Sequence, residues 1–246
     1  MDRMLYIGMT GAKHHMLSLR AVTNNLANAT TTGFREDYEQ FRSMPVFGPG
    51  HPTRAYAMSE RPGLNFTPGP LQTTGRDLDI AIEGDGWFAI QDPTGNEALT
   101  RAGNLKITPA GQLVDGSGNP VIGQDGPIAI PPAQKIEIAG DGTISIRPTG
   151  TDAVGMVVVD RIKMVNPPKQ ELLKGKDGMI RHESGQPQPA DANVHLVSGA
   201  LEGSNVDTVT SMVEMINLQR SYEMQVKAMA AANTVAQAAT SVLKMA

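Results

Sequence analysis

Apolar residues recur at helical spacing near the beginning of the chain. The recurring positions are separated by alternating steps of four and three residues: Leu5, Met9, Ala12, Met16, Leu19, Thr23 and Leu26. This spacing places them on one narrow stripe of a helix, and only Thr23 among them is polar. The pattern predicts a helix over residues 3–28. Because a single helix of this length is marginally stable in water, its stripe needs a partner.

A polar motif ends this helical pattern. Its residues are Asn24, Asn25, Leu26, Ala27 and Asn28, followed after a run of threonines by Gly33 and Phe34. Asparagine and threonine side chains compete for backbone hydrogen bonds, and glycine adopts the left-handed conformation that commonly ends a helix. The motif therefore predicts the corner at which the helix stops and the chain changes direction.

A second and longer heptad pattern occupies the other end of the chain. It follows Ser204-x-x-Asp207, which has the form of a capping box, although Asp is less usual than Glu at the last position. Steps of three and four residues then connect Met212, Met215, Gln219, Tyr222, Val226, Met229, Asn233, Ala236, Thr240 and Leu243. Most of these residues are apolar or aromatic, which predicts a long C-terminal helix.

Between these ends, prolines and glycines are concentrated. All 17 prolines lie between Pro45 and Pro189, and no glycine follows Gly203. Six of the prolines fall in residues 35–75: Pro45, Pro49, Pro52, Pro62, Pro68 and Pro70. Proline removes a backbone donor and opposes helices and central strands. We therefore expect residues 35–75 to form an extended, proline-rich connector with room for short edge strands.

From about residue 76 to 200 the hydrophobic period becomes two residues, as in β-strands. Leu78, Ile80 and Ile82 alternate with small or charged residues, and Asp-Gly pairs mark turns between such segments. The continuous apolar run at 156–159 predicts a more buried strand. Many short strands at this spacing are typical of an antiparallel β domain, a sandwich or a distorted barrel.

Together these patterns predict an α+β protein. The N- and C-terminal helices would pair as an antiparallel coiled coil, with the connector and a central antiparallel β domain between them. The expected ranges are 1–34 for the N-terminal helix, 35–75 for the connector, 76–202 for the β domain and 203–246 for the C-terminal helix. An ordinary pair of helices that covers a β core is the alternative.

Two observations favour assembly with other chains over this alternative. The C-terminal stripe is longer than the N-terminal helix, so part of it has no partner within the chain. Nine of the 14 methionines lie in the two ends, and methionine adapts to irregular neighbours. We expect the following residues to serve in helix packing and assembly: Leu5, Met9, Met16, Leu19, Leu26, Met212, Met215, Tyr222, Val226, Met229 and Leu243.

Composition and charge exclude several classes of function. The 246 residues carry a net charge of -4 at pH 7 with both signs interspersed, so no basic patch for nucleic acid is present. The chain has no cysteine, which excludes disulfides, thiol catalysis and cysteine metal sites. Its apolar runs are too short for membrane insertion, and charged residues interrupt any N-terminal secretory signal. If the protein is exported, it must use a route that does not read such a signal.

Candidate chemical sites are weak. His14 and His15 are adjacent and point to different faces of a helix, so they do not converge on a metal ion. Residues 115–119 faintly match a calcium loop but lack its downstream glutamate. Gly84 and Gly86 match part of a dinucleotide fingerprint, but a strand-like run follows them. We therefore predict no catalytic, cofactor-binding or metal-binding residues; a secreted β-rich enzyme or glycan-binding module is the alternative from another class.

Four ordered motifs in the chain resemble those of the bacterial flagellar rod and hook proteins. They are residues 24–34; 78–88; 99–104 with 111–114; and 202–207 with 215–216 and 219–223. Because these motifs occur in order along most of the chain, from residue 24 to residue 223, the chain is identified as a member of this family. Within the family, the chain most resembles the proximal rod proteins, in its length and in the sequence of residues 222–227. The distal rod paralogue and other rod or hook paralogues are the alternatives.

This resemblance implies a structural subunit of the proximal rod of the flagellar basal body, the drive shaft that transmits torque from motor to hook. The terminal helices would form an inner tubular layer and the β domain an outer layer of this periplasmic rod. The implied partners are other rod proteins, both distal and proximal, and further copies of the same chain. The flagellar type III export apparatus, which requires no cleaved signal, would be a partner during secretion. No cofactor is implied.

Overall fold

The computed structural model describes residues 3–39, 41–46, 55–59, 63–149, 155–175 and 177–245. Contacts divide the chain into two compact units. The first, called the helical unit, contains Met1–Ala29, Glu36–Asn65 and Val206–Ala246. The second, called the β unit, contains Thr30–Arg35 and Phe66–Asn205. Each unit therefore combines segments that are far apart in the sequence.

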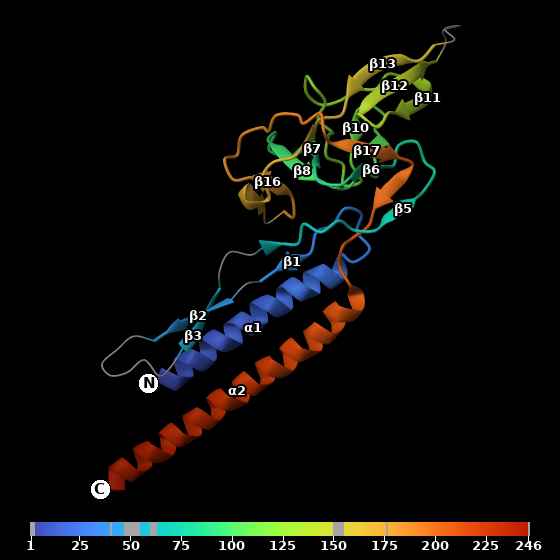
Figure 1. Ribbon diagram of the computed structural model, residues 1–246. Helices are drawn as coiled ribbons and strands as arrows, with labels where there is room; N and C mark the ends of the chain where they lie inside the picture. Colours follow the sequence, from blue (N-terminus) through green and yellow to red (C-terminus); the bar gives the residue numbers. More distant parts are fainter. Residues whose placement is uncertain are drawn as a thin grey trace. The chain divides into compact units, whose positions relative to one another are not determined.

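The helical unit is built around two long helices, α1 (Arg3–Ala27) and α2 (Thr208–Met245), which run side by side (Figure 1). Gly8 lies against Met229, and Gly11 lies against Gln225. Residue numbers rise along one helix as they fall along the other, so the pair is antiparallel. The predicted pairing of the N-terminal helix with the C-terminal helix is confirmed.

The ends of both helices are fixed by polar side chains. At the end of α1, Asn28 Nδ2 donates to the Asn24 carbonyl at 2.9 Å, and the chain then reaches Gly33 with φ of 68°. At the start of α2, the Asp207 carboxylate accepts from Val209 N at 3.0 Å and from Thr210 Oγ1 at 2.7 Å. Asp207 is thus the residue that caps α2, in the way expected of an N-cap aspartate.

The described residues between 36 and 65 contain two pairs of short strands in the helical unit. β1 (Asp37–Tyr38) pairs with β4 (Gly63–Leu64), and β2 (Phe41–Pro45) pairs with β3 (Ala55–Ser59), both antiparallel. β1 and β3 also contact α1. The described part of the expected connector therefore contains short paired strands, and two of them contact α1. Three prolines of the expected connector lie outside the described residues: Pro49, Pro52 and Pro62.

The β unit consists of small antiparallel sheets (Figure 1). The largest has the order β14 (Met164–Val165), β7 (Trp87–Gln91), β8 (Glu97–Thr100), β16 (Ile180–His182) and β15 (Leu172–Lys174). A second has the order β11 (Ala133–Ile138), β12 (Thr143–Pro148) and β13 (Val157–Arg161). Two-stranded sheets pair β6 (Ile80–Glu83) with β17 (His195–Ser198), β5 (Leu71–Thr73) with β18 (Ala200–Glu202), and β9 (Lys106–Ile107) with β10 (Leu113–Val114). A short 3-10 helix spans Lys169–Glu171.

A single cluster of apolar side chains forms the core of the β unit. It gathers residues from most of these strands, and its most deeply buried members are Ile80, Phe88, Leu105, Leu113, Val121, Ile128, Ile144, Ile146 and Ile162. The alternation of Ile144 and Ile146 with exposed or half-buried neighbours matches the predicted period of two. Burial of this apolar surface is the main stabilising contribution to the unit.

The prediction of a buried strand at 156–159 is wrong. Val157 and Val158 are 50% and 63% exposed. They lie on β13, which is an edge strand of the three-stranded sheet. An apolar run alone therefore did not distinguish a central strand from an edge strand. Among the described residues, neither helix is long and apolar enough to cross a membrane.

Candidate assembly site

The side of α2 that faces α1 is a regular stripe of less exposed residues. These residues recur every three or four positions: Ser211, Met215, Leu218, Ser221, Gln225, Met229, Ala232 and Ala236. Gln225 and Met229 of this stripe lie against Gly11 and Gly8 of α1. Glycine at both α1 positions lets the helices approach, because a Cβ atom on Gly8 would lie 2.8 Å from Met229 Cγ.

Only some of the packing residues predicted on α2 lie in this stripe. Met215 and Met229 do, whereas Met212 is 51% exposed and Tyr222 and Val226 are also exposed. The observed stripe shares Met215, Met229 and Ala236 with the predicted one and is shifted by one residue at the other positions. The side chain of Leu243 lies outside the described side chains.

The predicted stripe of α1 is likewise divided between two environments. Leu5, Leu19 and Leu26 are half-buried, while Met9 is 55% and Met16 64% exposed. Within the helical unit, therefore, neither α2 nor the strands cover Met9 and Met16. His14, which lies on another side of α1, is buried with its ring edge-to-face against Phe41.

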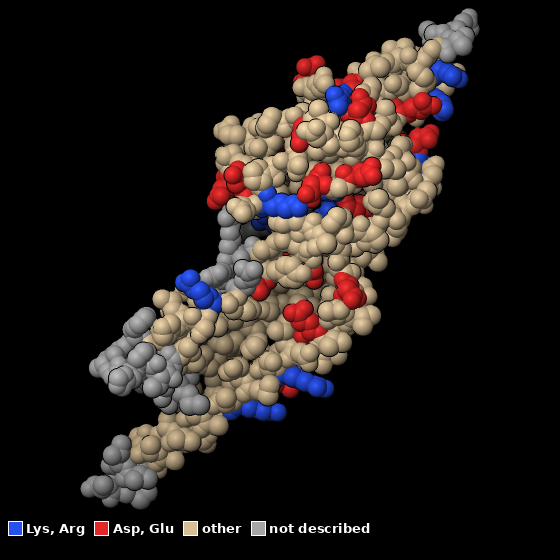
Figure 2. All heavy atoms as spheres, viewed as in Figure 1, with Lys and Arg blue, Asp and Glu red and all other residues tan. Residues whose placement is uncertain are grey.

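Both helices present exposed apolar side chains, which we call the exposed helix surface. Its members are Tyr6, Met9 and Met16 on α1 and Val209, Met212, Val213, Ile216, Met224, Val226 and Val235 on α2. Figure 2 shows few charged side chains over α2 on the face seen there. α1 carries Arg3, Lys13 and Arg20 but no acidic residue. Exposed apolar residues gathered in this way mark interaction surfaces.

The asparagines of the polar motif connect the end of α1 to strand β1. Asn25 is 3% exposed, and its amide pairs with the backbone of Asp37: Nδ2 donates to the carbonyl and Oδ1 accepts from the N–H, both at 2.9 Å. Asn24 Nδ2 donates to the Asp37 carboxylate at 2.9 Å. Leu26 is half-buried and Ala27 is exposed. The asparagines of the motif therefore connect the end of α1 to β1, at the position where the sequence predicted a change of direction.

The glycine and phenylalanine of the same motif belong to the β unit. Gly33 N donates to the Glu202 carbonyl at 2.8 Å, and a Cβ atom on Gly33 would lie 2.3 Å from the Arg101 carbonyl carbon. The Phe34 ring lies 4.3 Å from Lys174 Nζ, a cation–π contact. Gly33 is thus required both by its positive φ and by close backbone packing.

A buried ion cluster lies beside Gly33 in the β unit. The Glu202 carboxylate lies 2.7 Å from Arg35 Nη2 and 2.9 Å from Arg101 Nη1, and all three side chains are at most 3% exposed. Both guanidinium groups also lie over the Trp87 ring, at 5.8 and 5.4 Å from its centroid. Burial, opposed by the charge of Glu202, lowers the pKa of Arg101, and the nearby charge of Arg35 lowers it further.

Sequence reasoning did not predict this cluster. Arg101, Trp87 and Glu202 each lie in a motif that carried the family resemblance, and Arg35 directly follows another. The available signal was the presence of charged residues inside short motifs that contain glycine. Glycine allows the backbone to pack closely, and a charged side chain buried by such packing needs an oppositely charged partner. The motifs therefore come together in space, around one carboxylate.

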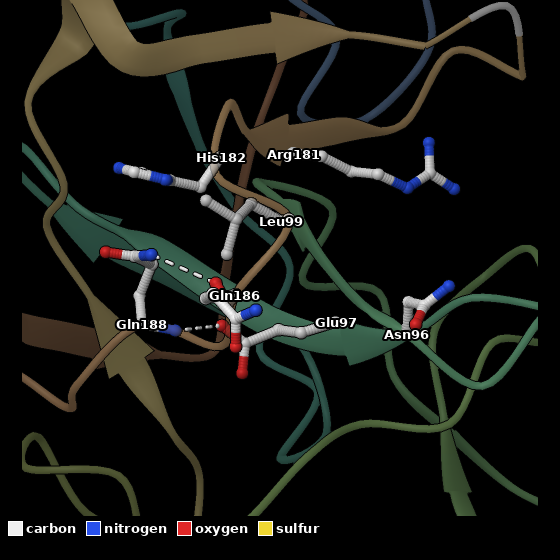
Figure 3. Close-up of a pocket in the computed structure, with 8 residues that line it drawn as sticks. Asn96, Glu97, Leu99, Arg181, His182, Gln186 and Gln188 are labelled. Carbon is white, nitrogen blue, oxygen red and sulfur yellow. Dashed lines mark hydrogen bonds between the residues drawn. The ribbon is translucent and has the colours of Figure 1, made fainter.

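A cavity of about 150 Å³ in the β unit does not form a catalytic site (Figure 3). It is lined by Asn96, Glu97, Leu99, Arg181, His182, Gly185, Gln186 and Gln188. The side chains of Arg181 and His182 point in opposite directions in Figure 3. The charged groups of two lining residues form ion pairs within the β unit: Arg181 pairs with Asp92 and Asp177, and Glu97 pairs with Lys163.

A serine, a histidine and a glutamate next to this cavity resemble a catalytic triad in spacing only. His182 Nδ1 lies 2.7 Å from Ser184 Oγ, and His182 Nε2 lies 2.6 Å from Glu171. The amides that follow the serine are already bonded, since Gly185 N donates to the His182 carbonyl and Gln186 N to Ser184 Oγ. No free amide pair is thus left after Ser184 to stabilise an oxyanion. Among the described residues, no three acidic or histidine side chains gather to hold a metal ion.

Two family models match this chain. The model described as the flagellar hook protein FlgE/F/G D1 domain matches residues 81–146. The model described as the flagellar basal body rod FlgEFG protein C-terminal matches residues 197–242. The first match contains Trp87 and Arg101, and the second contains Glu202 together with most of α2.

Individual relatives are similar over nearly the whole chain. The flagellar basal-body rod protein FlgF of Escherichia coli K12 is 41% identical over 252 residues, which cover 100% of both chains. The FlgF protein of Salmonella typhimurium is 42% identical over 234 residues, or 92% of each chain. The flagellar basal-body rod protein FlgG of Bacillus subtilis is 33% identical over 265 residues, covering 96% of this chain and 97% of the relative.

Proposed function

Because this chain belongs to the family of flagellar basal-body rod proteins, we propose that it is a structural subunit of the proximal rod, where it transmits torque towards the hook. The observation that carries the mechanism is the exposed helix surface on α1 and α2. The protein is a structural component and not an enzyme. Its assignment to the proximal rod is supported by the 41% identity to an FlgF protein, against 33% to an FlgG protein.

The exposed helix surface suits assembly with further subunits. Met9 and Met16 on α1, like Met212 and Met224 on α2, are exposed, and methionine packs against irregular partners. Different surfaces on the two helices can make heterologous contacts, which build helical filaments when they do not close into a ring. We infer that neighbouring rod proteins, distal or proximal, and further copies of this chain cover these residues.

The unequal lengths of the helices support a coiled coil that extends between subunits. Because Gly8 lies opposite Met229, the beginning of α1 falls opposite about residue 234 of α2. α2 continues to Met245, beyond the start of α1, as Figure 1 shows. We infer that helices of neighbouring subunits pack on this extension and complete the inner tubular layer. We infer that the sheets of the β unit pack as a sandwich or distorted barrel and that this unit forms the outer layer.

Secretion by the flagellar type III apparatus and a periplasmic location complete the proposal. Both follow from family membership. The helical unit combines residues 1–29 with residues 206–246, so it forms only when both segments are present.

A truncation tests the proposal directly. Deleting residues 209–246 removes α2 but no part of the β unit. The truncated chain should retain the folded β unit, shown by its dispersed amide spectrum, and should be absent from purified basal bodies. Normal basal bodies that contain the truncated chain would overturn the proposal.

A further inference from the structure

Every covalent connection between the two units leaves the β unit through a short segment near Glu202. The chain passes between the units after residues 29, 35, 65 and 205. On the β-unit side, these crossings belong to three segments: residues 30–35, 66–73 and 200–205. Any force carried along the chain from one unit to the other therefore enters the β unit through these three segments.

The three segments are hydrogen-bonded to one another within the β unit. Arg35 Nη1 donates to the Thr67 carbonyl at 2.6 Å, and Asn205 Nδ2 donates to the same carbonyl at 3.0 Å. Gly203 N donates to the Pro70 carbonyl at 2.9 Å. A Cβ atom on Gly69 would lie 2.1 Å from the Gly203 carbonyl oxygen, so the backbones are in close contact.

Glu202 contacts all three segments and also the loop after β8. Its carbonyl accepts from Gly33 N at 2.8 Å. Its carboxylate accepts from Gly69 N at 2.9 Å and pairs with Arg35 and Arg101. Arg101 in turn donates to the Gly84 carbonyl at 2.6 Å, next to strand β6. One buried side chain thus joins the crossing segments to the strands of the core.

The charges of the cluster make this carboxylate difficult to replace. Two guanidinium groups share one carboxylate, and all three are buried. Without the negative charge, Arg35 and Arg101 would face each other as buried cations, which is strongly unfavourable. A charge-assisted hydrogen bond from a backbone amide, such as that of Gly69, is also stronger than a neutral one.

We propose that Glu202 is a positioning residue that anchors every chain connection of the β unit in one place. It holds the three segments on the core, so that force from the helical unit enters through one buried cluster instead of through three separate segments. The mechanical part of this inference rests on the proposed function. The anchoring itself is a property of the isolated chain and can be measured there.

Hydrogen exchange of the purified full-length protein tests the anchoring. Glu202→Gln should raise exchange about tenfold or more in peptides covering 30–35 and 66–73, where each tenfold step corresponds to about 1.4 kcal/mol. Peptides from β7 and β8 should exchange as in the wild type. The matched control is Glu97→Gln, because Glu97 is also a buried carboxylate of the β unit, paired with Lys163 and the Gln188 amide. It should leave the crossing segments unchanged.

A second variant tests the anchoring of the three segments if Glu202→Gln does not fold. Arg35→Met leaves Arg101 and Glu202 as a balanced pair and removes the contacts of the Arg35 side chain with Thr67, Glu202 and Trp87. It should raise exchange in 30–35 and 66–69 and leave β7 and β8 protected. Unchanged exchange in these segments, or a uniform increase across the β unit, would overturn the proposal. These outcomes do not depend on rod assembly, so failure of the proposed function would appear separately, in the basal bodies.

Discussion

The amide of Asn25 pairs with the backbone of Asp37 through two hydrogen bonds of 2.9 Å, one donated and one accepted. The side chain thus takes the place of a neighbouring strand for β1 at the end of α1. This pairing explains why an asparagine stands at a buried position of the polar motif. Aspartate has nearly the same shape but lacks the donor.

Asn25→Asp should therefore destabilise the helical unit. It would place a carboxylate against the Asp37 carbonyl and leave a buried group without its partner, at a cost of about 1–3 kcal/mol. Thermal unfolding followed by helical circular dichroism measures this effect. The control is Asn24→Ala, which removes only exposed hydrogen bonds, to Asp37 and from Asn28, and should cost under about 0.5 kcal/mol. Equal stabilities of the two variants would refute the structural account of the motif.

Gly8→Val should separate the two helices. The new side chain would meet Met229 inside the helix contact, and overpacking of this kind costs about 1–3 kcal/mol. The same thermal measurement applies. Adding Met229→Ala should recover part of the loss, because it vacates the space that valine needs. A double variant no more stable than Gly8→Val would show that Gly8 does not lie against Met229.

Gly33→Ala tests close packing in the β unit. Gly33 and Gly178 both have positive φ, but only Gly33 has backbone atoms within the reach of a Cβ, whereas Gly178 has nothing within 4 Å. Gly178→Ala should cost about 1–2 kcal/mol for the left-handed backbone alone. Gly33→Ala should cost more, since the Arg101 backbone must move. Denaturant unfolding of both variants compares the two costs, and similar values would contradict the packing described for Gly33.

Asp92 should make the β unit less stable in acid. The hydroxyl of Thr94, together with Arg181 and backbone amides, holds the pKa of the Asp92 carboxyl well below its usual range, although burial opposes this. A carboxyl with a lower pKa in the folded state stabilises the protein above its unfolded pKa of about 3.9, and this contribution is lost as the pH falls. Asp92→Asn should therefore lower the urea midpoint at pH 7 and flatten its decline towards pH 2. An unchanged decline would show that Asp92 is not a source of the acid sensitivity.

The two helices were predictable because their heptad patterns are long. The residues of α2 that face α1 were only partly predictable. Ser211 and Gln225 face α1, while the apolar Met212 and Val226 beside them are exposed. A heptad spacing of three and four permits two neighbouring stripes, and selecting by apolarity gave the one that includes the exposed residues Met212 and Val226. Sequence periodicity does not distinguish packing within a chain from packing between chains.

The strands of the β unit were predictable from alternation, whereas long-range pairing was not. Ile80 and Ile144 are buried as their alternation indicates. Glu202 and Arg35, in contrast, are separated by most of the chain, and no local period connects them. Only the fold brings the four motifs to one carboxylate. The same limitation applies to Val158, whose exposure depends on the place of β13 in the sheet.

The central claim is that the exposed helix surface joins this subunit to its neighbours in the rod. The most direct measurement is the amount of the protein in purified basal bodies when Met16 and Val213 are both replaced by glutamate. Val158→Glu, on an equally exposed valine of the β unit, is the matched control, and secreted amounts of all chains are compared.

We predict that the Met16→Glu, Val213→Glu chain folds and is secreted but falls about tenfold or more in basal bodies, since buried unpaired charges are costly at an interface. The Val158→Glu control should be incorporated as the wild type is. Incorporation of the double variant at the wild-type amount would contradict the account.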